Sequence, residues 1–191
     1  WTVVESIAVP ESIKLQSEGC DAAVDAWRES LHALASAGVG VVCYNFMRVF
    51  DWLRTDLRQQ LPDGSYTMAF DQADLGQFDL EAGFDLPAWA NAYGPGDLPR
   101  LLAKYQGVDD ERLWDALASF LEVVVPVAES LGINLAIHPD DPPWPVFGLP
   151  RIIRDAPALR RLTGLVDSPS NGITFCTGSL GARPSNDPVS S

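Results

Sequence analysis

Residues 132–152 constrain the fold most, because a strand-length apolar run ends there abruptly at a histidine. The run is INLAIH, over residues 133–138, and Pro139, two aspartates and two further prolines follow it directly. Proline lacks a backbone donor and fixes its own φ angle, so a sheet cannot continue through this segment. The pattern predicts a buried strand that ends at His138, a side chain able to bind a metal. In barrel enzymes the loops after the strands gather at one face and carry the chemistry.

Three further apolar runs predict strands at 1–9, 40–46 and 171–177, the first of them mostly buried. Helical spacing of apolar residues predicts helices at 21–37, 109–131 and 156–166. Such alternation implies parallel strands joined by right-handed crossovers. Four strands do not close a barrel, since an eight-stranded (β/α) barrel needs about 250 residues. The pattern leaves two folds open, an open α/β sheet and part of a barrel.

Residues 48–107 form a long insert after the second predicted strand, and we expect residues 1–191 to form one domain around it. A structureless loop of this length is rare in a compact domain, so we expect short helices, with weak patterns at 75–81 and 99–105. Asp51, Trp52 and Arg54 leave the second strand directly. We therefore expect the insert to cover the C-terminal edge of the sheet as a lid or wall.

Composition excludes several classes of partner. The net charge is −13 without a Lys/Arg-rich run, which argues against nucleic acid. We expect no membrane partner either, because no apolar stretch reaches membrane-spanning length and no signal peptide is visible. The three cysteines are widely spaced, which indicates a reducing compartment and a cytoplasmic protein.

His138 and Cys176 each close a predicted strand, one strand-helix-strand unit apart. In a parallel sheet they should approach each other at the C-terminal edge, and imidazole and thiolate are good ligands for first-row transition metals. Two ligands do not define a metal site. Spacing alone favours the structural alternative, a half-buried histidine and a buried cysteine.

Charged residues near these two have a structural alternative as well. Asp140 and Asp141 could orient His138 or transfer protons, or they could cap the loop between the prolines. Arg54 and Arg151 could clamp a carboxylate bidentately, although exposed arginines in ion pairs are commoner.

The candidate pocket wall consists of Tyr44, Asn45 and Trp52, which could equally pack beneath the insert. Glu5 is a carboxylate inside a strand predicted to be buried, which is costly unless it is paired. We keep it as a modest functional candidate.

The chain resembles mannonate dehydratase, the sugar-acid dehydratase of hexuronate breakdown, in four stretches that together cover nearly its whole length. They are WTVVESIAV, VVCYNFMRVFDWLRTDL, LAIHPDDPPWPVFGLPRI and NGITFCTGSLGARPSND. The resemblance implies a (β/α)8 TIM barrel related to the xylose-isomerase-like sugar enzymes. This chain would hold about four of its parallel β/α units, with the first barrel strand preceding Trp1. The implied reaction is loss of water from D-mannonate to give 2-dehydro-3-deoxy-D-gluconate, with Mn²⁺ or Fe²⁺ bound.

By motif, His138 and Cys176 match two metal ligands of that family, and the remaining histidine and aspartate ligands lie on later strands. Asp140 is the carboxylate available for catalysis, and the candidate substrate-binding residues are Tyr44, Asn45, Trp52 and Arg54. The chain departs from the family pattern at Arg48, where we expect proline, and this adds a cation beside the presumed site.

Two alternatives remain from the sequence. One is a xylose-isomerase-like sugar isomerase or epimerase, although such enzymes more often use carboxylate-rich metal sites than a cysteine ligand. The other is a non-catalytic partial barrel, and we expect little dehydratase activity from the 191 residues alone. Uncovered strand edges would also favour association, so a homo-oligomer is compatible with the sequence.

Overall fold

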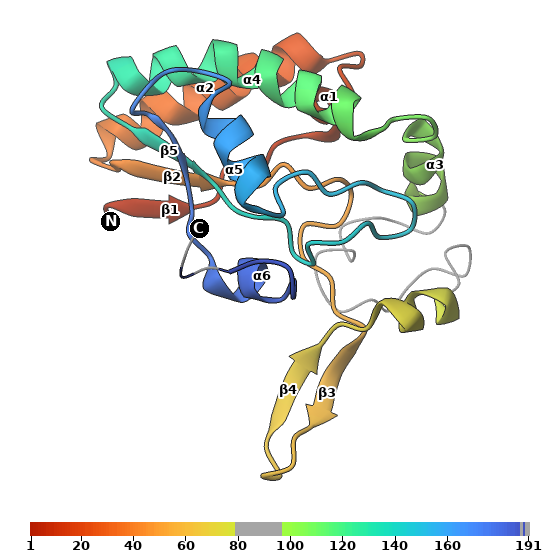
Figure 1. The fold of residues 1–191 in the computed structure, drawn as a ribbon. Helices are drawn as coiled ribbons and strands as arrows, with labels where there is room; N and C mark the ends of the chain where they lie inside the picture. The colour runs from red at the N-terminus through yellow and green to blue at the C-terminus, as the bar shows by residue number, and fades with distance from the viewer. Residues whose placement is uncertain (79–96, 188, 190–191) are drawn as a thin grey trace.

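The main sheet has four parallel strands in sequential order in this computed structural model, which describes residues 1–78, 97–187 and 189. The strands are β1 (Val3–Glu5), β2 (Val41–Tyr44), β5 (Asn134–Ile137) and β6 (Asn171–Ile173). β2 lies between β1 and β5, and β6 pairs with β5 (Figure 1). The predicted parallel order is confirmed, and the C-terminal ends of all four strands lie at one edge of the sheet.

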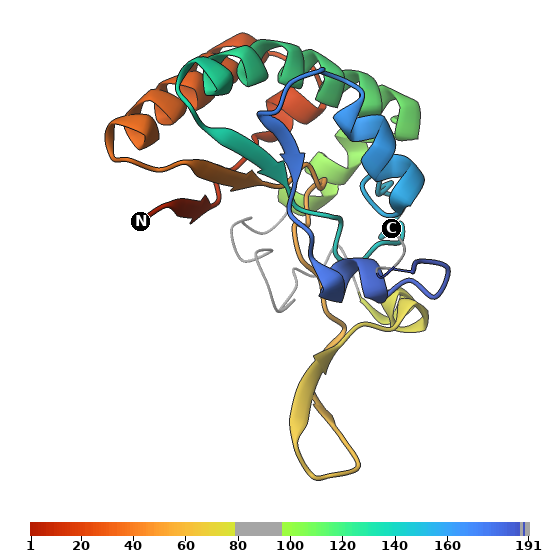
Figure 2. The same ribbon diagram turned by 60° about the vertical axis from the view of Figure 1, so that its left-hand side comes forward.

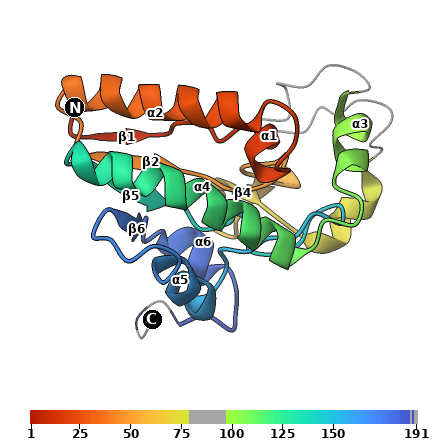
Figure 3. The same ribbon diagram turned by 90° about the horizontal axis from the view of Figure 1, so that it is seen from above.

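Three helices cover one face of this sheet: α2 (Cys20–Ser36), α4 (Asp110–Ser130) and α5 (Ala156–Thr163) (Figures 1 and 3). Asp109 caps α4 by accepting a hydrogen bond from the backbone N–H of Arg112, as its position before the apolar run predicts. Asp155 caps α5 in the same way, by accepting from the N–H of Ala158. None of these described helices is long and apolar enough to cross a membrane.

Strand alternation divides the side chains of the sheet between a packed face and an open face. Val42, Tyr44, Leu135 and Ile137 belong to the main core beneath the helices. Successive residues of a strand point to opposite faces, so their neighbours Cys43 and Ala136 point away from the helices. The side chains that continue these two strands on the open face are therefore Asn45 and His138.

Strand β1 is shorter and more exposed than predicted for residues 1–9. Only Val3–Glu5 are in strand conformation, and Val3 remains 52% exposed. β1 pairs only with β2 among the described strands, and its side away from the helices is uncovered. Glu5 is consequently exposed, so the expected cost of burying its carboxylate does not arise. A short helix, α1 (Glu11–Lys14), follows β1 and was not predicted.

The insert contains a β-hairpin that the sequence did not indicate. Strands β3 (Asp56–Gln60) and β4 (Tyr66–Ala69) pair antiparallel and project away from the body of the protein (Figures 1 and 2). The sequence of β3, DLRQQ, shows no apolar–polar alternation, and every one of its residues is exposed. The insert therefore carries a hairpin in addition to the short helices expected of it.

The two helical patterns predicted in the insert have different outcomes. The pattern at 99–105 overlaps α3 (Asp97–Lys104), which is confirmed. Of the pattern at 75–81, the first part belongs to a 3-10 helix, η1 (Gln72–Gln77), and residues 79–81 lie outside the described part of the chain.

A second, smaller hydrophobic cluster joins the insert to the loop after β5. Its fully buried members are Val49, Phe50, Leu53, Leu98, Tyr105, Val146 and Leu149. The ring of Phe70, just after β4, also stacks on Trp144 of that loop, with 5.9 Å between the ring centroids. The described ends of the insert therefore pack at the C-terminal side of the sheet, as predicted.

Arg48 is fully buried and donates to the backbone oxygens of Val108 and Asp109, at 3.0 Å each. It thus joins the end of β2 to the start of α4. We expected Arg48 to add a cation beside the site, and this was wrong, because its side chain is directed at the carbonyls that precede α4.

Candidate functional site

A cavity of about 530 Å³ lies at the C-terminal edge of the sheet. It draws residues from the segments that follow β1, β2, β5 and β6, so the whole edge contributes to it. His138 and Cys176 both line it, which confirms that they share this edge. The lining residues are Glu5, Ser6, Asn45, Met47, Asp51, Trp52, His138, Asp141, Cys176 and Ser179.

His138 is oriented by contacts on both its backbone and its ring. Its backbone N–H donates to the carbonyl of Tyr44 at 2.8 Å, which continues the pairing of β5 with β2. Nδ1 lies 2.7 Å from the carbonyl oxygen of Pro139. A carbonyl can only accept, so Nδ1 carries the hydrogen in this contact and the neutral ring keeps a lone pair on Nε2. This is the tautomer that a metal-binding histidine needs.

Cys176 lies three residues beyond β6, not at its last position as predicted, and immediately precedes the short helix α6 (Thr177–Gly181). Its thiol is free and partly exposed. The sulfur lies 3.2 Å from the hydroxyl oxygen of Ser179. A thiol on the cavity wall is chemically able to ligate a metal as thiolate.

Asp141 is the aspartate of the HPDDPP motif that reaches the cavity, and it is held by Arg54. The two side chains form a bidentate ion pair with N–O distances of 2.7 and 3.0 Å. The Arg54 guanidinium also lies 4.5 Å from the centre of the Trp52 ring. Because Arg54 is already paired, the structure presents it as a support for Asp141 and not as an open carboxylate clamp.

Asp140 is buried beneath the loop and does not line the cavity. Its side chain is 1% exposed and accepts a hydrogen bond of 2.9 Å from the backbone N–H of Ile153. Burial raises the pKa of its carboxyl group above the ordinary value. These contacts contradict the catalytic role expected for Asp140, because a group so enclosed cannot reach a substrate in the cavity.

Arg151 likewise belongs to the buried support. It is fully buried and donates to the backbone oxygen of Phe50 at 2.7 Å. Burial lowers the pKa of its guanidinium, and the neighbouring carboxylates Asp140 and Asp51 oppose this shift.

Of the predicted pocket wall, Asn45 and Trp52 line the cavity and Tyr44 does not. The ring of Tyr44 packs edge-on against Trp27 and Phe120, with centroid distances of 6.0 and 6.1 Å, on the helix side of the sheet. Tyr44 and Asn45 are adjacent in the sequence, so they point to opposite faces. The expectation that Tyr44 binds substrate is contradicted by this placement.

Sequence reasoning did not assign site roles to Asp51, Met47, Ser6 or Ser179, all of which line the cavity. Asp51 precedes Trp52, and burial raises the pKa of its carboxyl group while Lys14 opposes that shift. The position of Ser179, three residues after Cys176 at the start of a helix, was the available signal.

The cavity wall is acidic. It carries the carboxylates of Glu5, Asp51 and Asp141 and no lysine or arginine among the described residues. No group of three or more metal-ligand side chains occurs within the described part of the chain. Imidazole and thiolate suit a transition metal in donor chemistry, so His138 and Cys176 could together offer two donors to one ion.

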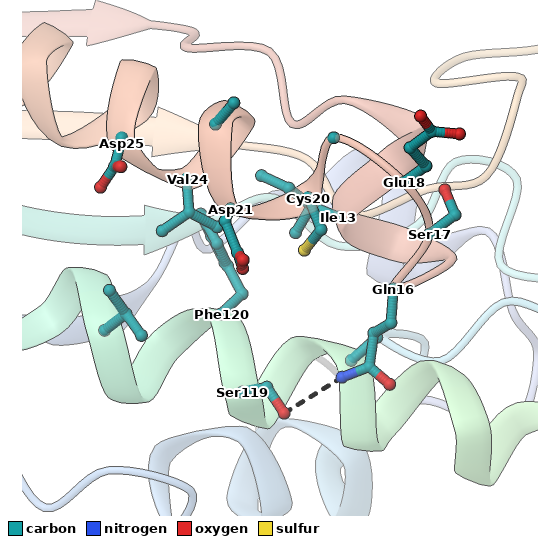
Figure 4. A pocket seen from close by; sticks show the side chains of 14 residues that line it. Ile13, Gln16, Ser17, Glu18, Cys20, Asp21, Val24, Asp25, Ser119 and Phe120 are labelled. Atoms are coloured by element: carbon teal, nitrogen blue, oxygen red, sulfur yellow. Dashed lines mark hydrogen bonds between the residues drawn. The ribbon is translucent and has the colours of Figure 1, made fainter.

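A larger cavity, of about 900 Å³, lies between α1, α2 and α4 (Figure 4). Gln16 and Ser119 bridge it with a hydrogen bond of 3.2 Å. Cys20 lines it, and the pKa of its thiol is raised by burial and by Asp21. No histidine and no residue of the four strands is among the described residues that line this cavity, so size alone does not identify the functional site.

The fold and the site define an α/β protein of the (β/α) barrel class, with four of its strands and a polar cavity at their C-terminal ends. The D-mannonate dehydratase (UxuA) family pattern matches residues 1–191. The chain belongs to this family.

Individual relatives agree with the match. The chain is 47% identical to mannonate dehydratase from Bacillus subtilis (strain 168), over 98% of this chain and 54% of that protein. It is 45% identical to mannonate dehydratase from Geobacillus thermodenitrificans, over 97% and 52% respectively. The crystal structure of mannonate dehydratase from Streptococcus suis serotype 2 superposes with a TM-score of 0.87 at 42% identity, over 99% of this chain and 51% of that one. The chain thus spans about half the length of these relatives.

Proposed function

We propose that the full-length protein containing this chain dehydrates D-mannonate to 2-dehydro-3-deoxy-D-gluconate. This reaction belongs to hexuronate breakdown. In this proposal the protein is a hydro-lyase, and the chain supplies His138 and Cys176 to its metal site. The observation that carries the proposal is that both residues line one cavity at the C-terminal edge of the sheet, within a family match over residues 1–191.

The proposed metal is Mn²⁺ or Fe²⁺, because a thiolate ligand favours a softer ion than Mg²⁺. When bound, it would supply the positive charge that stabilises the enediolate formed on removal of the proton α to the substrate carboxylate. His138 would hold it through Nε2, which its contact with Pro139 leaves free, and Cys176 through Sγ.

The acidity of the cavity supports a requirement for a cation. Glu5, Asp51 and Asp141 would repel a sugar acid, and the Arg54 side chain is already paired with Asp141. A divalent ion reverses the local charge and makes binding of a carboxylate favourable. Around it, Asn45 and Trp52 are the proposed substrate contacts, with Arg54 acting through the Asp141 side chain it holds.

The proposal also concerns the location and the oligomeric state of the protein. Three free cysteines favour the cytoplasm. In the 191-residue chain alone, the edges of β1 and β6 that are unpaired among the described strands favour association of copies into a homo-oligomer.

The test is formation of the keto acid from D-mannonate by the full-length protein and by the 191-residue chain, each with Mn²⁺, Fe²⁺ or Mg²⁺ added. We expect turnover by the full-length protein with Mn²⁺ or Fe²⁺, and little or none by the short chain, in which two protein donors leave a weak site. Absence of turnover by the full-length protein with every metal would refute the proposed activity. Robust turnover by the short chain would show that residues 1–191 complete a site by themselves.

A further inference from the structure

A chain of polar contacts runs from the insert to the sulfur of Cys176. Ser179 connects its two ends, because its hydroxyl oxygen lies 3.2 Å from Cys176 Sγ and 3.4 Å from Asp141 Oδ2. Arg54 then holds Asp141 bidentately from the insert side. Ser179 is 2% exposed, so bulk water does not compete for its hydroxyl.

Asp141 is a fixed point in this chain. Besides its ion pair with Arg54, its backbone N–H donates to the sulfur of Met47 at 3.2 Å. It also forms an isolated parallel bridge with Trp52. A hydroxyl that bonds Asp141 is therefore fixed relative to both the loop after β2 and the insert.

Cys176, in contrast, needs support. Strand β6 ends at Ile173, so ladder pairing does not extend to the cysteine. The sulfur is on the cavity wall, partly exposed, with Gly178 beside it: a Cβ at Gly178 would lie 3.9 Å from Sγ. Among the described residues, the only hydrogen-bonding side chain recorded for this sulfur is that of Ser179.

We propose that Ser179 is a positioning residue for Cys176, and that the Arg54–Asp141–Ser179 chain fixes the direction of the free thiol before a metal binds. The inference rests on the proposed metal site. In the free thiol, the S–H can donate to the Ser179 oxygen while the Ser179 hydroxyl donates to Asp141. When a metal binds the thiolate, the single hydroxyl hydrogen would be donated to the sulfur instead. Groups that orient a metal ligand in this way commonly change metal affinity about 10- to 100-fold when removed.

The test compares Ser179→Ala with a matched control, Ser119→Ala, in the full-length protein loaded with Co²⁺. Ser119 lies on α4, where its hydroxyl accepts from Gln16 and donates to the carbonyl of Asp115, so the control also removes one hydroxyl with two contacts. The readouts are the thiolate-to-cobalt charge-transfer absorption and the Co²⁺ dissociation constant from competition titration. Thermal unfolding of the metal-free variants checks that both are folded.

We expect Ser179→Ala to shift or weaken the charge-transfer band and to raise the dissociation constant about 10-fold or more, while the control matches the parent protein. Equal spectra and affinities for the two variants would overturn the inference. A parent protein whose spectrum shows no thiolate band would instead refute the proposed metal site itself, so the two failures are distinguishable.

Discussion

Adjacent residues at the end of β5 have opposite roles, and only the folded chain separates them. Asp140 is buried and accepts a hydrogen bond from the backbone N–H of Ile153, whereas Asp141 lines the cavity. Tyr44 and Asn45 differ in the same manner at the end of β2. Alternation along a strand predicts that neighbours diverge, but beyond its last residue the proline-rich loop no longer follows that period. This is why the sequence indicated the motif but could not tell which of the two aspartates lines the cavity.

Asp51 provides a pH-dependent prediction at this scale. Burial raises the pKa of its carboxyl group above 3.8, so keeping it ionised costs the folded state more than the unfolded state. A raised folded pKa means that this cost is fully present at neutral pH and disappears as the pH falls below 3.8. Asp51→Asn should therefore raise the free energy of unfolding at pH 7, with the gain shrinking toward pH 4.

Urea unfolding across this pH range measures the effect, with Asp167→Asn as the control because Asp167 is exposed. A pH-independent change in Asp51→Asn would contradict the raised pKa, because it would show that the attraction of Lys14 and Arg151 balances the cost of burial. Destabilisation at pH 7 that disappears toward pH 4 would show that this attraction outweighs the cost.

Arg48 gives a prediction about the join between β2 and α4. Arg48→Met keeps much of the volume but leaves the carbonyls of Val108 and Asp109 without their donor, so we expect a loss of about 2–4 kcal/mol in the free energy of unfolding. Arg58→Met on the exposed hairpin should change it by less than about 0.5 kcal/mol. Denaturant unfolding of both variants measures these changes. Equal changes would mean that the buried guanidinium makes no net contribution to the free energy of unfolding.

At the scale of elements, the helices were predictable and the insert was not. The amphipathic spacing of α4 and its Asp109 cap identify that helix from the sequence, and the observed bounds differ by one residue at each end. In the hairpin, β3 reads DLRQQ, with one apolar residue and every residue exposed, so it has no alternating pattern to detect. β4 is only four residues long, YTMA, which is too short to predict a strand by itself.

The hairpin should be dispensable for folding. Asp56 and Ala69 are paired directly across it, so residues 57–68 can be replaced by an Asn-Gly turn without displacing the ends. We expect the free energy of unfolding to change by less than about 0.5 kcal/mol. Leu53→Ala, at a 1%-exposed position of the second cluster, should in contrast cost about 2–5 kcal/mol.

Circular dichroism and denaturant unfolding compare these two variants with the parent chain. Loss of folded structure in the shortened protein would show that the hairpin makes contacts that stabilise the fold.

At the scale of the whole molecule, the sheet has a packed face and an open one. The order of strands and the shared edge for His138 and Cys176 followed from the β-α alternation, because parallel crossovers leave few topologies. The exposure of β1 did not follow, since its apolar residues look the same whether or not a neighbour covers them. Val3, predicted to be buried, is 52% exposed for this reason.

The central claim is that His138 and Cys176 hold one metal ion, and X-ray absorption at the metal edge of the Fe²⁺-loaded full-length protein tests it most directly. We predict sulfur and imidazole-nitrogen scatterers in the parent protein. The sulfur should be lost in Cys176→Ala and retained in Cys43→Ala, whose buried thiol lies 3.1 Å from the Thr174 hydroxyl on the same face. His138→Ala should lower the imidazole contribution. An unchanged sulfur signal in Cys176→Ala, or none in the parent protein, would contradict the account.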